Sequence, residues 1–347
     1  MINYLIRRTI TAVFTLFVIS IISFVIIQLP EGDVVDQYVQ NRTADRTILS
    51  DEDLAEMRET LGLNNPAIIQ WWDWLVPVVT KGDLGQSYVN HGWTGRGYTS
   101  IPVNYYIEEK LPFTIYLSLF TMIITWAFAI PIGIYSAMRQ HSMGDYIFTF
   151  LGFTGLAIPD FLLAIVLMYV FFAYFDLSVG GLFSGDYLDA PWSISRVADM
   201  LQHLIIPGLV LGTSGTAGLI RVMRNNLLDE LTKPYVVTAR SKGLSSWKVV
   251  VKYPVRLAIN PFISGIGAML PALVSGSIIV SIVLSLPTLG PIFLEATMTQ
   301  DGPLAGAIVL LLAVLTVLGT LISDITLVLV DPRIKLTGSG TGSSSAT

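Results

Sequence analysis

Long apolar stretches alternate with polar ones along this chain, and the apolar stretches have the length of membrane spans. Each contains about the twenty residues that an α-helix needs to cross a bilayer. The six stretches cover residues 1–29, 112–137, 146–175, 203–228, 261–286 and 304–330. This pattern predicts an all-α polytopic membrane protein with six transmembrane helices.

The first apolar stretch follows two arginines, Arg7 and Arg8. A cleaved signal peptide would also begin in this way, but this stretch is longer than the usual one. No small-x-small cleavage pattern follows it either. We therefore expect an uncleaved first helix, over residues 1–29, whose N-terminus lies in the cytoplasm.

A long polar segment over residues 30–111 separates the first two spans. It contains thirteen acidic residues and six basic ones. Because cytoplasmic loops carry an excess of Lys and Arg, this acidic balance predicts an extracytoplasmic loop or subdomain.

Local signals predict structure inside that segment. Ser50 followed by Asp53 forms a capping box that begins a helix, and Gly62 ends it just after Leu61. Asn65-Pro66 begins a second helix, whose three tryptophans favour an interfacial aromatic belt over a docking surface or a carbohydrate-stacking platform. The tryptophans are Trp71, Trp72 and Trp74. The Gly-rich residues 89–100 predict a hairpin or loop.

The overall composition supports one membrane domain rather than two soluble ones. Hydrophobic residues make up 53% of the chain, charged residues 13%, and the mean hydropathy is +0.66. A soluble protein would be near a quarter charged. There is no cysteine, which excludes disulfides and thiolate metal sites, and the three histidines are scattered.

The basic residues concentrate between the fourth and fifth spans, where residues 221–256 contain eight bases and two acids. The sequence predicts two short helices around a turn. Thr232 can cap the first, Pro234 suits its first position and Gly243 suits a left-handed residue at its end. Ser245 or Ser246 can begin the second helix, which Pro254 ends or kinks.

This basic segment should lie on the cytoplasmic face. Two interpretations stay open on charge alone: a helical surface that binds a partner, or a positive loop that only sets topology. Residues 176–202 and 287–303 then form outer loops, residues 138–145 form an inner turn, and both termini lie inside. Residues 336–347 are a flexible Gly/Ser-rich tail.

Several motifs together resemble one family. The basic segment contains A-R-S-K-G-L and ends in Asn-Pro. Other motifs, in chain order, are R-R before the first span and L-P-E-G-D after it, K-G-D-L-G-Q-S-Y, E-K-L-P-F-T, G-L-A-I-P, L-P-T-L-G and D-P-R-I-K-L. Their order and spacing resemble ABC-importer permeases over nearly the whole chain. The resemblance is to the dipeptide/oligopeptide type, first (B-type) permease subunit.

This resemblance implies a type I ABC-importer permease in a prokaryotic plasma (inner) membrane, with a large extracytoplasmic first loop. Residues 112–335 would form a five-helix permease core with a cytoplasmic coupling loop at 229–260. Within that loop a helix would enter a groove of the ATPase subunit. The residues expected to make this contact are Tyr235, Thr238, Ala239, Arg240, Lys242, Gly243 and Leu244.

The resemblance also implies partners: a second, non-identical permease, two ATP-binding subunits and an extracytoplasmic solute-binding protein. This chain lacks G-x-x-x-x-G-K-[ST], so ATP and magnesium are expected on the partner subunits, with no cofactor, catalytic residue or nucleic acid here. The family transports peptides, but also oligosaccharides and nickel chelates, so the sequence leaves the cargo open.

Two acidic residues lie within the predicted spans. Asp160 follows Pro159 near the middle of the third span, and either a structural hydrogen bond or a place on the substrate pathway would explain it. For Asp324, in the sixth span, we expect a structural role. The family often has Ser at the place of Asp160 and an acid at the place of Ser281, which weakens inference about the substrate route.

Two other function classes use such acids. An ion-coupled secondary transporter would bind its ions at Asp160 and Asp324, but that class usually has an internal repeat, and none is visible here. An intramembrane aspartyl protease would use the same two carboxylates, but neither lies in a G-x-G-D motif. The ABC-importer permease is the favoured hypothesis.

Overall fold

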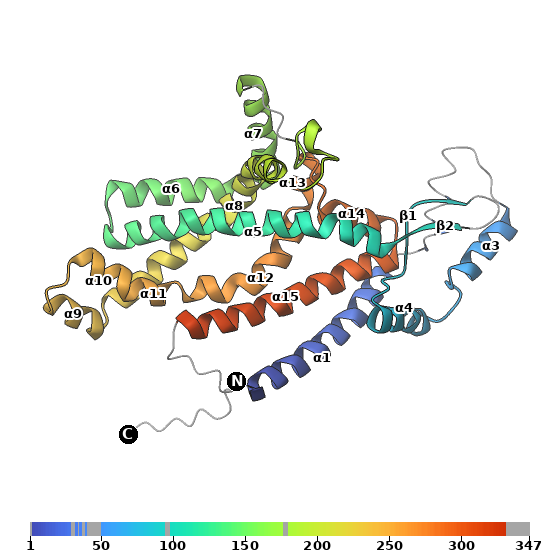
Figure 1. Cartoon of the computed structure of the whole chain (residues 1–347), viewed down its shortest axis with the longest axis horizontal. Coiled ribbons are helices and arrows are strands. Elements are labelled where there is room, and N and C mark those ends of the chain that lie inside the picture. The colour runs from blue at the N-terminus through green and yellow to red at the C-terminus, as the bar shows by residue number, and fades with distance from the viewer. Residues whose placement is uncertain are drawn as a thin grey trace.

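The computed structural model describes residues 2–28, 32, 33, 35, 36, 39, 50–93, 98–175 and 180–330. Its long helices run along the long axis of the molecule (Figure 1). A hairpin of β1 (Gln86–Trp93) and β2 (Tyr98–Pro102) lies at one end. Two short helices, α9 (Pro234–Ser241) and α10 (Ser246–Lys252), lie at the other. We call these the hairpin end and the α9–α10 end.

Within the described residues, four unbroken helices are long and apolar enough to cross a membrane. They are α1 (Ile2–Ile27), α5 (Val103–Met138), α8 (Ile194–Leu231) and α15 (Gly302–Val330). Helix α5 packs along α8, and α1 packs on α15. These helices confirm the all-α membrane fold.

The third predicted span is not one straight helix. It divides into α6 (Met143–Ala157) and α7 (Asp160–Phe175), which meet at a bend of 101°. Ile158 between them is extended, with φ −89° and ψ 123°, because the residue before a proline disfavours the helical region. Counted as one bent span, this pair gives a fifth crossing.

The fifth predicted span is also interrupted. Helix α12 (Asn260–Gly276) is separated from α13 (Ile278–Val283) by Ser277, and Ser285 then turns with φ 52°. Helix α12 packs along α15 like a span, but it is shorter than the four long helices. The count of six spans therefore stays a prediction.

Some helix ends differ from the prediction. Helix α5 begins nine residues before the predicted position 112, and α8 begins at Ile194, inside the predicted outer loop 176–202. A capping residue explains the start of α8: the Ser193 side chain accepts a hydrogen bond from the Arg196 backbone N–H. The loop predicted over 287–303 contains another helix, α14 (Leu289–Met298). A short 3₁₀ helix, η1 (Gly185–Tyr187), precedes α8.

The predicted elements of the hairpin end are present. Helix α3 (Asp51–Thr60) has the reciprocal capping box of Ser50 and Asp53, and Gly62 follows with φ 67°. Helix α4 (Ala67–Lys81) begins after Pro66. Strands β1 and β2 pair antiparallel, from Gln86 opposite Pro102 to Trp93 opposite Tyr98, with an irregularity between Ser87 and Gly92. The hairpin prediction is confirmed.

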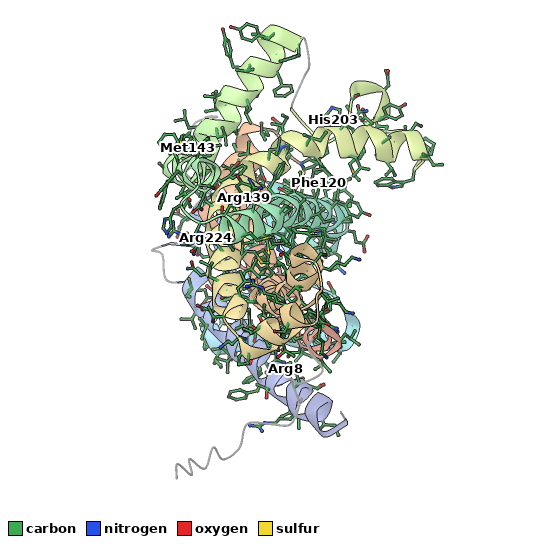
Figure 2. The ribbon with its side chains drawn as sticks, turned by 90° about the vertical axis from the view of Figure 1, so that its left-hand side faces the viewer. Arg8, Phe120, Arg139, Met143, His203 and Arg224 are labelled. Atoms are coloured by element: carbon green, nitrogen blue, oxygen red, sulfur yellow. The ribbon has the colours of Figure 1, made fainter. Side chains whose placement is uncertain are left out.

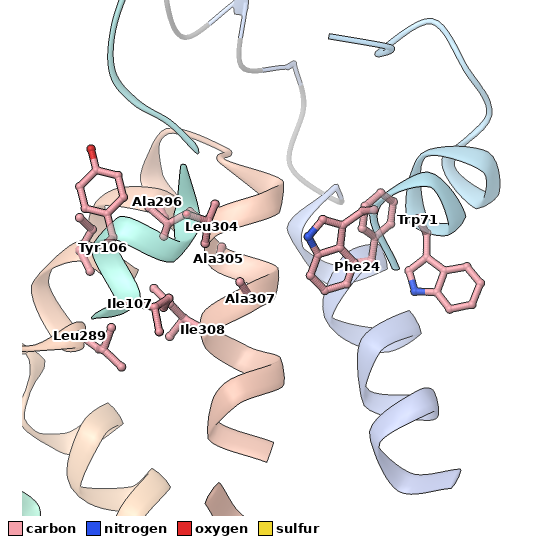
Figure 3. Close-up of a cluster of buried hydrophobic side chains, with 13 residues drawn as sticks. Phe24, Trp71, Tyr106, Ile107, Leu289, Ala296, Leu304, Ala305, Ala307 and Ile308 are labelled. Atoms are coloured by element: carbon pink, nitrogen blue, oxygen red, sulfur yellow. The ribbon is translucent and has the colours of Figure 1, made fainter. Parts of the chain in front are cut away.

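A hydrophobic cluster fastens the hairpin end to the long helices (Figure 3). Trp71 and Trp74 of α4 contribute to it together with buried residues of α1, α5, α14 and α15. The Trp74 indole N–H donates to the Leu84 carbonyl at 3.1 Å. Beside this cluster lies a cavity of about 610 Å³, lined in part by Gln70, Asp73 and Trp74.

Close helix contacts organise the rest of the bundle. A Cβ atom on Gly133 of α5 would lie 2.5 Å from the Met223 Cβ of α8, and one on Gly267 of α12 would lie 2.4 Å from Thr320 Cγ2 of α15. Only glycine permits helices to approach so closely. The pairs α5–α8 and α12–α15, which lead to the α9–α10 end, are therefore tightly packed.

Candidate coupling segment and transmembrane acids

The segment predicted to couple with an ATPase, residues 229–260, folds as helices α9, α10 and α11 (Pro254–Ala258). We call it the coupling segment. Val236 and Ala239 of α9 pack against Val249 of α10. This small internal cluster holds the two helices together, so the segment is a folded unit and not an extended loop.

Local sequence signals explain most of this shape. Pro234 occupies the first position of α9, and Gly243 after it has φ 75°, as predicted. A Cβ on Gly243 would meet nothing within 4 Å, so the backbone conformation alone requires glycine. The prediction that Thr232 caps α9 is wrong. Lys233 is the N-cap, while Thr232 ends α8, its hydroxyl donating to the Asp229 carbonyl.

Five of the seven predicted coupling residues lie on the exposed surface. They are Thr238, Arg240, Lys242, Gly243 and Leu244.

The other two predicted coupling residues point elsewhere. Tyr235 is half-buried, and its hydroxyl donates to the Glu230 carboxylate. Ala239 is only 6% exposed and faces α10, so it supports the helix pair and cannot present a contact surface in this conformation.

Besides Leu244, three exposed apolar residues of the segment were missing from the predicted set. Val237, Trp247 and Val251 lie on the surface of α9 and α10 among the basic residues. A tryptophan in the basic segment, directly before Lys248, was the available signal. A surface that mixes exposed apolar and basic side chains suits a protein partner better than a purely topological loop.

The coupling segment is also tied to the end of α15. The Arg256 guanidinium of α11 donates to the carbonyl oxygens of Val330 at 2.6 Å and Leu329 at 3.4 Å. These are among the last carbonyls of α15, which have no partner within their own helix. Arg256 therefore caps one long helix from the segment beside it.

The turn between α5 and α6 lies at the same end (Figure 2). Its Asp145 accepts a hydrogen bond from the His141 backbone N–H at 3.0 Å and pairs with Arg224 of α8 at 3.3 Å. His141 itself adopts φ 59°. This partly buried ion pair fixes the turn against α8.

Asp160 stands directly after the break between α6 and α7, not in the middle of a straight helix. Its side chain is half-buried, and the Ser214 hydroxyl of α8 lies 3.5 Å from its Oδ2. At this distance the hydrogen bond is weak. The position fits either hypothesis for Asp160, so its place on a pathway stays a prediction.

The other acids and Ser281 have structural partners. Asp324 pairs with Arg8 of α1 at 3.1 Å, which joins α1 to α15. Ser281 is fully buried and accepts a hydrogen bond from Thr288 at 3.0 Å. The partners of Asp160 and Asp324 thus come from different helices. Across the described part of the chain, no group of three acids or histidines is placed to bind a metal.

Comparison with known protein families identifies the family of this chain. The family model described as the inner membrane component of binding-protein-dependent transport systems matches residues 129–336, and the model of its N-terminal region matches residues 1–118. The chain belongs to this family. It is a permease subunit of an ABC importer, a multi-pass membrane protein that is not an enzyme. ATP hydrolysis takes place on separate ATPase subunits.

Relatives of this permease match it over almost their whole length. It is 36% identical over 333 residues to an oligopeptide transport system permease protein of Bacillus subtilis, covering 96% of this chain and 99% of the relative. A glutathione transport system permease protein of Salmonella typhimurium is 29% identical over 96% of this chain and 99% of its own. An inner membrane ABC transporter permease of Escherichia coli is 31% identical, over 96% and 99%.

Membership of this family decides between the three function classes. The hypotheses of an ion-coupled transporter and of an aspartyl protease are rejected in favour of the importer permease.

Proposed function

We propose that this permease forms one half of the translocation pathway of a peptide importer. A second, non-identical permease forms the other half, two ATP-binding subunits drive it, and an extracytoplasmic solute-binding protein delivers the cargo. The observation that carries the proposal is the coupling segment: a folded pair of helices with an exposed basic and apolar surface, at the end of the molecule opposite the hairpin (Figure 1).

The charge distribution supports the sidedness of this assembly. The acidic segment 30–111 leads into the hairpin end, and the basic coupling segment occupies the opposite end. The positive-inside rule then places the coupling segment and both termini in the cytoplasm. Because the natural chain has no cysteine, single cysteines at Arg240 and at Lys81 can be labelled from either side of the membrane. Labelling of the Lys81 position from the cytoplasmic side would contradict this orientation.

The contact with the ATPase is proposed for the exposed residues of α9 and the turn after it. Arg240 is exposed in the last turn of α9. Arg240→Glu reverses a charge at this surface, so we expect reduced recovery of ATPase subunits in a pull-down of the tagged permease. Lys81→Glu makes the same reversal at the hairpin end and serves as the control. Equal recovery from both variants would mean that Arg240 only sets topology.

The subunit composition is tested by purification from the native membrane followed by mass measurement of the intact complex. We expect this chain, one different permease and two ATPase subunits. A stable homodimer of this chain with ATPase subunits and no second permease would contradict the proposal.

Peptide cargo is proposed from two of the relatives named above, which are by name permeases of an oligopeptide and of a glutathione transport system. A thermal-shift screen of the cognate solute-binding protein against peptides, oligosaccharides and nickel chelates tests it. Stabilisation by short peptides is the expected result, and stabilisation only by a sugar or a metal chelate would reject peptide cargo.

Asp160 is proposed to line the pathway, since it stands at a break between helices with only a weak hydroxyl contact. An acid there would favour neutral or cationic cargo. Asp160→Asn should leave assembly and ATP hydrolysis intact but change the uptake rate or the cargo preference. If the variant destabilises the complex while the surviving complex transports normally, Asp160 is structural.

A further inference from the structure

Helix α4 has three different surfaces: one packs on the long helices, one lines a cavity, and one is exposed. Trp71 and Trp74 are buried in the cluster with α1, α5, α14 and α15. Gln70 and Asp73 line the adjoining cavity. The third surface is apolar and exposed, and consists of Ile68, Ile69, Trp72, Val76 and Val79.

This exposed surface is a continuous stripe and not a set of scattered residues. Positions 68, 72, 76 and 79 recur at the three- and four-residue spacing that places side chains on one face of a helix. Val79 is 75% exposed and Trp72 is 54% exposed. A stripe of large apolar side chains on a short helix marks an interaction surface.

The position of α4 beside the membrane-spanning helix α1 indicates that the bilayer covers its exposed apolar surface. The Trp71 ring contacts the Phe17 ring of α1 edge-on, with centroids 5.6 Å apart. At the ~1.5 Å rise per residue of an α-helix, Phe17 lies roughly 15 Å from the end of α1 at Ile27. Since the hydrocarbon core of a bilayer is about 30 Å thick, Trp71 reaches into one leaflet.

The lipid-facing surface of α1 continues onto α4. Phe14, Phe17, Ile22 and Val25 of α1 are exposed, and α1 spans the membrane. The Gln28 side chain just after α1 donates a hydrogen bond to Gln70 of α4 at 2.9 Å, which holds the two helices side by side. The apolar stripe of α4 therefore joins an apolar surface that already faces lipid.

We propose that α4 is an interfacial anchor whose stripe of Ile68, Ile69, Trp72, Val76 and Val79 inserts into the bilayer at the boundary between headgroups and acyl chains. A helix with one apolar and one polar face takes this position because its apolar side chains leave water while its polar ones stay hydrated. Asp73, Thr80 and Lys81 supply the polar side. This anchor would set the height of the hairpin end above the membrane, whichever leaflet it occupies.

Site-directed spin labelling tests this proposal on the full-length permease. The natural chain has no cysteine, so Ile68→Cys, Trp72→Cys and Val79→Cys each provide one label. Lys81→Cys is the matched control on the polar side of the same helix, and Val25→Cys on α1 is the control for lipid exposure. The samples are proteoliposomes of phosphatidylethanolamine and phosphatidylglycerol, without any solute-binding protein. Collision rates are measured with oxygen, which enters lipid, and with a water-soluble nickel chelate.

The expected oxygen-to-nickel ratio at Ile68, Trp72 and Val79 is several times that at Lys81 and close to that at Val25. Ratios equal to that at Lys81 would overturn the proposal. Protection from nickel that arises only after a solute-binding protein is added would also overturn it, because the stripe would then be a protein-docking surface. Three separate label positions keep the test decisive if one variant fails to fold.

Discussion

The two ends of this permease are both built from short helices, but they are fastened in different ways. At the hairpin end, α4 inserts Trp71 and Trp74 into a cluster shared with four other helices. At the α9–α10 end, α9 buries mainly Val236 and Ala239, and it does so against its neighbour α10. The first end is attached by large side chains, and the second by small ones.

This difference has a physical meaning. Burying an aromatic side chain removes far more apolar surface from water than burying a valine or an alanine, so the hairpin end is held to the bundle more strongly. At the α9–α10 end, Val236, Ala239 and Val249 keep the shape of the helix pair, while Val250 of α10 packs on the long helices. The basic surface of this end stays exposed. One end is organised for attachment, and the other for presenting a surface to a partner.

The largest effect is expected at the hairpin end. Trp74→Ala should destabilise it by about 3–5 kcal/mol, because a fully packed indole and its hydrogen bond to Leu84 are lost. Limited proteolysis should then cleave within residues 50–93, while the ATPase subunits still bind. Trp72→Ala removes a tryptophan that lies outside the cluster, two residues earlier, and should increase cleavage far less. Equal sensitivity of both variants would show that the cluster does not fasten this end.

Two adjacent valines separate folding from docking at the other end. Val236 is completely buried and Val237 is 56% exposed. Val236→Ala should loosen the α9–α10 pair by about 2 kcal/mol through lost burial and a small cavity. It should therefore speed amide hydrogen exchange in α9.

Val237→Ala should leave that exchange rate unchanged but reduce ATPase binding in the same pull-down. Faster exchange in Val237→Ala, or unchanged exchange in Val236→Ala, would contradict the assignment of Val236 to folding and Val237 to docking.

The turn after α9 gives the next largest effect. Gly243→Val forces a β-branched residue into a left-handed conformation, at a cost of about 1–2 kcal/mol, although no neighbour lies within 4 Å of its Cβ. We expect ATP hydrolysis that no longer drives uptake, or loss of assembly. Gly265→Ala, at a helical glycine with equally open surroundings, is the control and should retain coupled transport. Normal transport by the Gly243 variant would rule out a fixed shape for this turn.

Acid should produce the smallest effect, through the lowered pKa of Asp33 at the hairpin end. Burial alone would raise the pKa of Asp33, but hydrogen bonds and charge from Arg58, with backbone N–H groups, outweigh it and lower the pKa. A lowered folded-state pKa contributes stability above the unfolded value of about 3.9. That stability is lost as the pH falls through the folded-state pKa. Because the pair is partly exposed, we expect less than about 1 kcal/mol.

Hydrogen exchange in α3, corrected for intrinsic rates and compared between pH 6 and pH 3, measures this loss. Arg58→Gln should remove the part of the pH dependence that comes from Asp33, because the Arg58 side chain bridges Asp33 at 2.8 Å and Asp36 at 2.6 Å. The part that comes from Asp53 in the capping box of α3 should remain. The same acid dependence in the variant would assign it to another group.

Sequence patterns predicted the features that depend on the conformation of one residue or on the mean hydropathy of a long stretch. The capping box at Ser50, the left-handed Gly243 and the hairpin were predicted correctly because each is a local conformational requirement. The long helices were predicted because many apolar residues contribute to each. Helix ends were less accurate: α5 begins at Val103, although Glu108, Glu109 and Lys110 lower the hydropathy of its first turns.

Features that depend on tertiary packing were not predictable in the same way. The span predicted over 146–175 is interrupted at Pro159, and the sequence does not reveal the 101° bend between α6 and α7, which both pack on α8. Ala239 lies in a predicted partner-binding motif, and only the position of α10 shows that it faces inward. The partner of Asp324 likewise comes from the other end of the sequence.

The glycine contact between α12 and α15 has a mechanical consequence. At Gly267 and Gly319 the two backbones touch, since a Cβ on Gly319 would lie 2.8 Å from the Gly267 Cα. No side chains lie between them to compress or change rotamer. Arg256 of the coupling segment holds the C-terminal end of α15 in the same pair. A displacement of α9 and α10 would thus move α12 and α15 together as one rigid body, with little change in the contact between these two helices.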